Sequence, residues 1–306
     1  MNSQKSMSTR AWVELFLLAI IWSGSFLAAA FVLREVGVVT VVAHRVFWAA
    51  LILWIFVLAR GYAVPRGLGI WGAFFVMGLL NNVIPFSLMV WGQKFIESGL
   101  VSILNSATAI FGVLVAAIVF ADERLTLRKI LGVFIGFVGV ASTIGLENLL
   151  SFDPRSMAQL AVVLGTVFYA LGSSWARKTM SHLPSEVAAA GMLTGSSLVM
   201  VPAAFAFDGI PSVNLSLTTF AALGFYAVFA TALAYLLYYR VLKMAGSGNL
   251  TLVTLVIPPI AILLGAVLLG ERLGPNAFFG FSLVALGLIV LDGRLFRILL
   301  DLIRRG

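Results

Sequence analysis

The residues of this chain that could do chemistry are hydroxyls, amides and aromatic rings set inside long apolar segments. In the segment 217–239, Thr231, Tyr235 and Tyr238 follow one another at i, i+4 and i+7, a spacing that places them on one face of a helix. A few polar groups among aromatic walls orient a small solute without reacting with it. The pattern therefore predicts a binding site for a small molecule.

Polar or amphipathic side chains in other apolar segments extend this predicted site. Together with Tyr235 and Tyr238, we expect the solute to meet Trp22, His44, Asn82, Asn105, Tyr169 and Thr254. The alternative is that the amides and hydroxyls hydrogen-bond from helix to helix and only hold the bundle together. For the two asparagines both interpretations stay open.

Two groups that carry or can carry charge, His44 and Arg45, stand next to each other in the segment 38–59, about 10 Å from its start at 1.5 Å per residue. Adjacent residues of a helix point about 100° apart, so the two cannot share a face. His44 is the one group inside the apolar zone that titrates near neutral pH, although a buried, hydrogen-bonded imidazole is the alternative. Arg45 is expected to pair with backbone carbonyls where the halves of the chain meet, with a substrate carboxylate as the alternative.

Catalytic and metal chemistry find little support. The chain has no cysteine, and Gly172-Ser173-Ser174 lacks the glycine that follows the serine in the usual nucleophile turn. Asp122-Glu123 is an isolated acidic pair, too small for a metal-dependent transferase. We therefore predict no enzyme, no metal and no cofactor. Because carboxylates are missing from the middle of the segments, a tightly proton-coupled pump is also disfavoured.

The composition shows what kind of element must position these residues. Hydrophobic residues make up 61% of the 306 positions and charged residues 10%, with a mean hydropathy of +1.09, whereas soluble domains carry about 25% charged residues. Most of the surface must therefore face lipid. The net charge of +8 does not indicate nucleic acid, because Lys and Arg occur singly or in pairs between apolar runs.

The fold class predicted is an all-α integral membrane protein with ten transmembrane helices. Spanning segments must be helical because lipid offers no hydrogen-bond partner to free backbone groups. The predicted spans are 11–33, 38–59, 69–92, 98–120, 128–146, 157–176, 186–206, 217–239, 248–270 and 276–292.

The basic residues predict the orientation of the ten helices. With a cytoplasmic N-terminus, the inner side would hold Lys5, Arg10, Arg60, Arg66, Arg124, Arg128, Lys129, Arg177, Lys178, Arg240, Lys243, Arg294, Arg297, Arg304 and Arg305. The outer side would hold only Arg34, Lys94, Arg155 and Arg272. This bias follows the positive-inside rule, so both termini are predicted to be cytoplasmic.

The chain contains a repeat, which divides it into 1–150 and 151–306. Glu123-Arg124-Leu125 matches Glu271-Arg272-Leu273, and Lys94-x-x-x-Ser98-Gly99 matches Lys243-x-x-x-Ser247-Gly248 in nearly the same register. Five crossings per half is an odd number, so the second half begins on the opposite side of the membrane. Such inverted repeats are typical of secondary transporters.

Several short motifs carry a resemblance to a known family. Asn81-Asn82-x-x-Pro85-Phe86, Trp91-Gly92-Gln93 and Ser98-Gly99-Leu100 resemble the EamA family of the drug/metabolite transporter superfamily. The resemblance covers nearly the whole chain and implies a ten-helix carrier of the inner membrane. It also implies export of amino acids or other small metabolites, without specifying which.

The function predicted is export of small metabolites, most of all neutral or aromatic amino acids, by alternating access. Pro85, Pro258 and Pro259 are the predicted hinges because proline removes backbone donors within a helix. The alternatives are export of other metabolites or drugs, a channel, and exchange of nucleotide sugars or phosphate esters, which would need several cationic residues. The partners predicted are a small solute and the bilayer, with a monomer as the simplest assembly.

Overall fold

The computed structural model describes residues 8–121, 125–145, 153–212, 214–245 and 253–292. Within these ranges every regular element is helical and there is no strand. Eight helices are long and apolar enough to cross a membrane, and Val256–Leu269 and Pro275–Leu291 are shorter apolar helices. The predicted all-α fold is confirmed.

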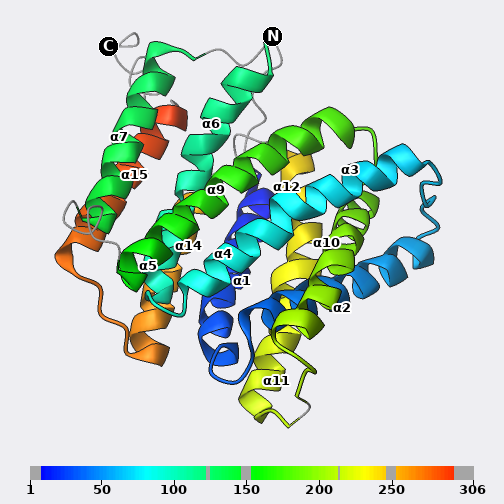
Figure 1. Cartoon of the computed structure of the whole chain (residues 1–306). Helices are drawn as coiled ribbons and strands as arrows, with labels where there is room; N and C mark the ends of the chain where they lie inside the picture. Colours follow the sequence, from blue (N-terminus) through cyan, green and yellow to red (C-terminus); the bar gives the residue numbers. More distant parts are fainter. Residues whose placement is uncertain (1–7, 122–124, 146–152, 213, 246–252, 293–306) are drawn as a thin grey trace.

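The helices group into ten spans, several of which run obliquely through the bundle (Figure 1). In chain order the spans are α1 (Thr9–Val32); α2 (Val38–Ala59); α3 (Leu68–Gly78), η1 (Leu79–Val83) and α4 (Ile84–Gly92); α5 (Ser98–Asn105) and α6 (Ala107–Val119); α7 (Leu127–Ile144); α9 (Pro154–Thr179); α10 (Ser185–Phe207); α11 (Leu217–Gly224), η2 (Phe225–Leu233) and α12 (Ala234–Ala245); α14 (Val253–Leu264) and η3 (Gly265–Leu269); and α15 (Pro275–Asp292). We call the side where α1 begins the near face and the opposite side the far face.

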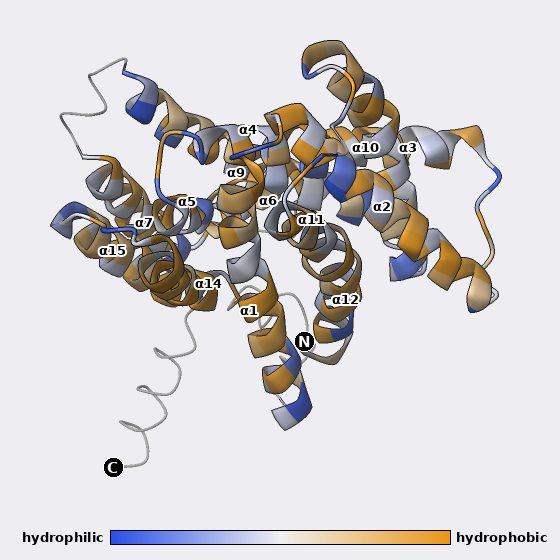
Figure 2. Ribbon diagram, turned by 90° about the horizontal axis from the view of Figure 1, so that it is seen from below, coloured by the Kyte–Doolittle hydropathy of each residue, from blue (hydrophilic) through white to orange (hydrophobic). Residues whose placement is uncertain are grey.

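Large apolar side chains cover the outside of the bundle. Phe16, Ile55, Leu198 and Phe279 are among those that remain exposed, and hydrophilic residues gather towards the helix ends (Figure 2). A soluble protein rarely exposes apolar surface on this scale. The outer surface is therefore that of a membrane protein, as the composition predicts.

The two halves pack against each other in matched pairs. The second span (α2) packs on the seventh (α10), and the fifth (α7) on the tenth (α15); the first (α1) packs on α12 and α14 as the sixth (α9) packs on α4 and α6. Between α7 and α15 the backbones touch: a Cβ on Gly139 would lie 2.6 Å from the backbone nitrogen of Val284. Glycine permits this close approach, and Gly132, seven residues earlier in α7, approaches the backbone of α15 in the same way.

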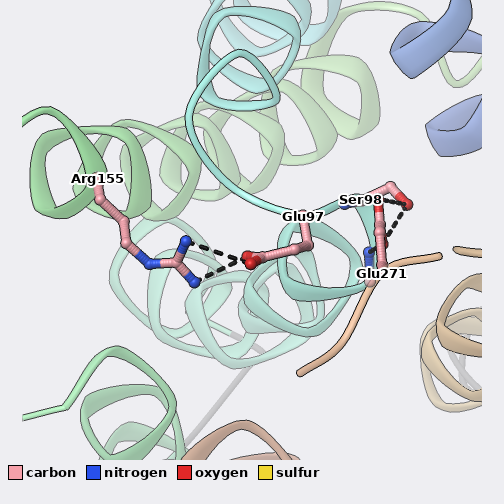
Figure 3. A network of polar contacts seen from close by, with 5 residues as sticks. Glu97, Ser98, Arg155 and Glu271 are labelled. Atoms are coloured by element: carbon pink, nitrogen blue, oxygen red, sulfur yellow. Dashed lines mark hydrogen bonds and ion pairs between the residues drawn. The ribbon is translucent and has the colours of Figure 1, made fainter. Parts of the chain in front are cut away.

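On the far face, carboxylates of one half bind helix starts of the other. Glu271 accepts hydrogen bonds from the backbone nitrogens of Ser98 (2.9 Å) and Gly99 (3.2 Å), the first residues of α5 (Figure 3). Asp208 likewise accepts from the nitrogen of Thr40 at 2.7 Å. A carboxylate at a helix N-terminus satisfies free donors and complements the helix dipole. In the described part of the chain, the hydrogen bonds of Glu271 are all with this helix start, including the hydroxyl of Ser98.

Two more contacts join the halves at the far face. Arg155 of α9 makes a two-pronged ion pair with Glu97, at 2.8 and 3.3 Å. Glu35 receives hydrogen bonds from the hydroxyl and the backbone nitrogen of Ser216, which lower the pKa of this carboxyl. On the near face, Glu14 of α1 pairs with Arg240 of α12 at 2.6 Å. Most of these described contacts across the repeat boundary lie at the far face, and the Glu14–Arg240 pair joins the halves at the near face.

Candidate functional site

The third and eighth spans contain π-helices at positions that correspond in the repeat. η1 occupies Leu79–Val83 and η2 occupies Phe225–Leu233. π-helical turns inside α-helices are rare and often mark functional sites. In the third span the wide turn precedes Pro85, which has no N–H for the usual backbone bond. In the eighth, the hydroxyl of Thr231 donates to the carbonyl of Tyr226 at 2.8 Å.

Tyr235 connects these two spans through a pair of asparagines. Its hydroxyl donates to Oδ1 of Asn82 at 3.1 Å and accepts from Nδ2 of Asn81 at 3.0 Å. Asn82 is fully buried, and its Nδ2 donates to Ser196 of α10 at 2.8 Å. Asn82 thus fits the helix-fastening interpretation, whereas Asn81 keeps part of its surface accessible. Sequence reasoning missed Asn81, although it stands in the same Asn-Asn motif.

Aromatic side chains from four spans lie in the region of Tyr235. Trp22 of α1 lies 6.0 Å from Tyr238, centroid to centroid, and Tyr169 of α9 lies 6.3 Å from Phe86 of α4. Ring contacts run from Trp22 to Tyr238, on to Tyr239 and then to Tyr235, and Tyr169 lies close enough to Tyr235 to act on it electrostatically. We call the aromatic cluster the set Trp22, Phe86, Tyr169, Tyr226, Tyr235, Tyr238 and Tyr239.

Arg45 of α2 lies against the aromatic cluster. Its Cζ is 3.7 Å from the ring centre of Phe86 and 4.8 Å from that of Tyr226, an arrangement in which the ring faces attract the cation. Its Nε donates to the hydroxyl of Thr231 at 3.0 Å. The expected pairing with backbone carbonyls is wrong. The sequence does contain a signal that assigns Arg45 to the site, namely a positively charged residue inside an apolar membrane-spanning segment.

His44 lies apart from these residues. Its Nδ1 accepts a hydrogen bond from Nε1 of Trp48 at 3.1 Å, and Trp48 is 46% exposed on the outer side of α2. His44 and Arg45 therefore point to different sides of the helix, as their adjacency predicts. The contacts of His44 place it with the lipid-facing side chains, so its predicted role in solute binding gains no support.

Asn105 and Thr254 lie where the fourth span crosses the ninth. The fourth span breaks at Ser106, whose hydroxyl donates to the carbonyl of Thr254 at 3.1 Å. That carbonyl would normally accept from residue 258, but Pro258 has no N–H. A neighbouring serine thus satisfies the backbone group that the proline frees. α14 continues through Pro258 and Pro259 and becomes π-helical only at Gly265.

Two hollows lie outside the aromatic cluster. One of about 180 Å³ at the far face is lined by Arg155, Gln159 and Asn276, among others. The Oε1 atom of Gln159 is buried there and has no hydrogen-bond partner among the described residues. A broader hollow of about 630 Å³ at the near face is mainly apolar and includes Trp175 and His182. Sequence reasoning pointed to neither.

A multi-pass helical protein of two inverted five-helix halves, with polar residues among aromatic rings where the halves meet, has the architecture of a secondary transporter. The model of the EamA-like transporter family matches residues 11–145 and again residues 156–291. The chain therefore belongs to the EamA-like transporter family, within the drug/metabolite type of transporters, and the predicted resemblance is confirmed.

Relatives agree with this assignment. A protein of Archaeoglobus fulgidus named "Uncharacterized transporter" is 25% identical over 284 residues, covering 92% of this chain and 98% of the relative. A protein of Escherichia coli named "Probable amino-acid metabolite efflux pump" is 25% identical over 223 residues, covering 70% and 74%. A solved crystal structure aligns with a TM-score of 0.67 at 19% identity, over 94% of this chain and 98% of that one, which shows the shared fold.

Proposed function

We propose that this transporter exports small metabolites, above all neutral or aromatic amino acids, by alternating access across a bacterial-type inner membrane. The observation that carries the proposal is the aromatic cluster with Asn81 and Arg45, placed between π-helices of both repeats. Ring faces suit an apolar or aromatic side chain, and a few polar groups suit its polar end. Relatives named as probable amino-acid metabolite efflux pumps support the same class of solute.

Orientation and repeat boundaries belong to the same proposal. We place the near face in the cytoplasm, because the loops on that side carry most of the Lys and Arg residues. Both termini would then be cytoplasmic. We take 1–150 and 151–306 as the two units that move relative to each other, with Pro85, Pro258 and Pro259 as hinge positions.

A nucleotide-sugar or phosphate-ester exchanger is the weaker candidate. Phosphate groups are commonly held by several Arg or Lys side chains. In the part of the chain that the structure describes, Arg45 is the only Lys or Arg that contacts the aromatic cluster. Other metabolites and drugs remain outcomes of the transport test below.

Uptake into liposomes tests the proposed function. The purified full chain is reconstituted and given a panel of radiolabelled amino acids and unrelated metabolites, with protein-free liposomes as the control. We expect saturable transport of at least one neutral or aromatic amino acid. Transport should proceed without a pH gradient, since the described carboxylates lie in loops or within about two turns of a helix end. If no amino acid is transported, the proposed solute class is overturned. Flux that does not saturate with solute concentration would favour a channel. Strict dependence of transport on a pH gradient would overturn the prediction that no proton coupling is needed.

A further inference from the structure

Arg45 holds a permanent charge inside a membrane-spanning helix, and no described residue places an opposite charge beside it. It lies about 10 Å from the far end of α2. A guanidinium has five N–H donors, and Arg45 uses one of them, on Nε, for the hydroxyl of Thr231. Among the described residues its other N–H groups have no hydrogen-bond acceptor, and no carboxylate pairs with it.

The surroundings of Arg45 leave a place for an anion. The ring faces of Phe86 and Tyr226 attract the cation, but they are weaker partners than a carboxylate, which can take two parallel hydrogen bonds from one guanidinium. Phe86 also contacts Tyr169 edge to face. Aromatic rings would therefore lie beside a carboxylate bound to Arg45. These rings could pack against the apolar part of the same solute.

Beside Arg45, the described part of the spans offers no carboxylate that could bind a positive charge. Glu14, Glu35, Glu97 and Glu271 lie at or near helix ends, where they pair with arginines or bind helix starts. Glu186, in the first turn of α10, lies close enough to Tyr239 of the cluster to act on it electrostatically. Among the described residues, however, the contacts of Arg45, Phe86 and Tyr226 include no carboxylate. Beside Arg45, a carboxylate therefore meets a charged partner, whereas an ammonium group meets only ring faces and neutral oxygens.

We infer that Arg45 binds the carboxylate of the transported solute, and that the solute class is apolar or aromatic monocarboxylates in which an α-amino group is dispensable. This inference rests on the proposed function and narrows its solute class. A single arginine matches a single negative charge, in contrast to the several cations that a phosphate ester requires. The rival role is mechanical: Arg45 joins the first half to Thr231 and Tyr226 of the second.

Four probes separate carboxylate recognition from amine recognition. Phenylalanine carries both groups, 3-phenylpropionate carries only the carboxylate, and phenylalaninamide and phenethylamine carry only the amine. Binding to the purified full chain is followed by tryptophan fluorescence, since Trp22 lies within the aromatic cluster. We expect phenylalanine and 3-phenylpropionate to bind with similar affinity. The two amines should bind about 10–100-fold more weakly, the range for losing a charge-assisted hydrogen bond.

Variants of Arg45 test whether it is the source of this preference. Arg45→Gln should bind all four probes equally weakly. Arg45→Lys should still prefer the two carboxylates over the two amines, but with reduced affinity, because lysine keeps the positive charge and lacks the planar guanidinium that donates two parallel hydrogen bonds. Arg60→Gln is the matched control, since Arg60 follows the last residue of the same helix and its Cζ lies 5.2 Å from the ring centre of Phe56. If Arg45→Gln does not fold, binding of the four probes to the wild-type protein and to Arg45→Lys still tests whether the site recognises a carboxylate.

Three results would overturn the inference. They are equal binding of amide and acid by the wild-type protein, a preserved preference in Arg45→Gln, and binding of none of the four probes. In the last case, saturable transport of another solute in the liposome panel would leave the proposed function standing. The failure of the carboxylate inference is therefore distinguishable from the failure of the transport proposal.

Discussion

At the scale of single residues, Tyr235 has the most connected position in the candidate site. Its hydroxyl bonds both Asn81 and Asn82, and its ring lies 6.5 Å from that of Tyr239. The hydroxyl therefore links the third and eighth spans, while the ring contributes to the aromatic cluster. These two contributions can be separated by mutation.

Tyr235→Ala should abolish most transport while folded protein is still recovered, because it removes part of the aromatic cluster. Tyr235→Phe should keep partial activity. It retains the ring but leaves the buried Oδ1 of Asn82 without its donor, at a cost of about 1–3 kcal/mol. The measurement is liposome transport of two solutes of different size, normalised to folded protein, with exposed Tyr62→Ala as control.

A purely structural role of Tyr235 predicts a different pattern. Tyr235→Ala would then reduce the yield of folded protein, and the remaining protein would transport both solutes at unchanged relative rates. That outcome would remove Tyr235 from the solute path.

Sequence reasoning recovered the types of residue at the site better than their orientation. Helical spacing and repeat matching identified Tyr235, Tyr238, Trp22 and Tyr169, which the structure brings together. Repeat matching chose Asn82 over Asn81, and both residues lie inside a π-helix, where α-helical periodicity does not describe which way a residue faces. Sequence reasoning also chose His44, whose neighbour Trp48 holds it on the lipid-facing side.

At the scale of elements, the far ends of the helices carry the contacts between halves. The contact of Glu271 with the start of α5 is the most extensive of them, since Ser98 contributes both its nitrogen and its hydroxyl (Figure 3). Gly265 faces the same carboxylate at a distance that leaves no room for a Cβ. The exposed ion pair of Glu97 and Arg155 lies next to it and provides an internal comparison.

Glu271→Ala should destabilise the protein by about 1–3 kcal/mol, because buried backbone donors lose a charged acceptor. Glu271→Gln should cost less, since its amide oxygen can still accept a hydrogen bond. Glu97→Ala should cost about 0–1 kcal/mol, as is typical of exposed ion pairs. Denaturation of the three purified variants under identical detergent conditions measures the order. A loss for Glu97→Ala as large as that for Glu271→Ala would contradict the role given to Glu271.

Helix positions were readable from the sequence, but their internal geometry was not. Apolar segments of membrane length place the spans to within a few residues, because lipid leaves helices as the only solution. The sequence also identified proline as a site of irregularity. It did not reveal that Ser106 satisfies the carbonyl freed by Pro258, since that contact joins residues of different spans.

At the scale of the whole molecule, the matched pairing of spans relates the two halves by inversion. Such symmetry lets one scaffold open to either side by exchanging the conformations of its halves. Most of the described polar contacts between the halves lie at the far face, and the aromatic cluster lies between the halves. Under the proposed alternating access, solute should reach the cluster from each face in turn.

Cysteine labelling tests this central claim most directly, and the chain has no cysteine of its own. Tyr235→Cys and Asn81→Cys are treated with a membrane-impermeant thiol reagent from either face, with and without a transported solute. Ala63→Cys on the near face and Asn214→Cys on the far face report which side each reagent reaches, and Asn82→Cys is the buried control. We predict that Ala63→Cys reacts only from the cytoplasm and Asn214→Cys only from outside. Tyr235→Cys and Asn81→Cys should react from both faces and be protected by solute, whereas their resistance to the reagent in every condition would contradict the account.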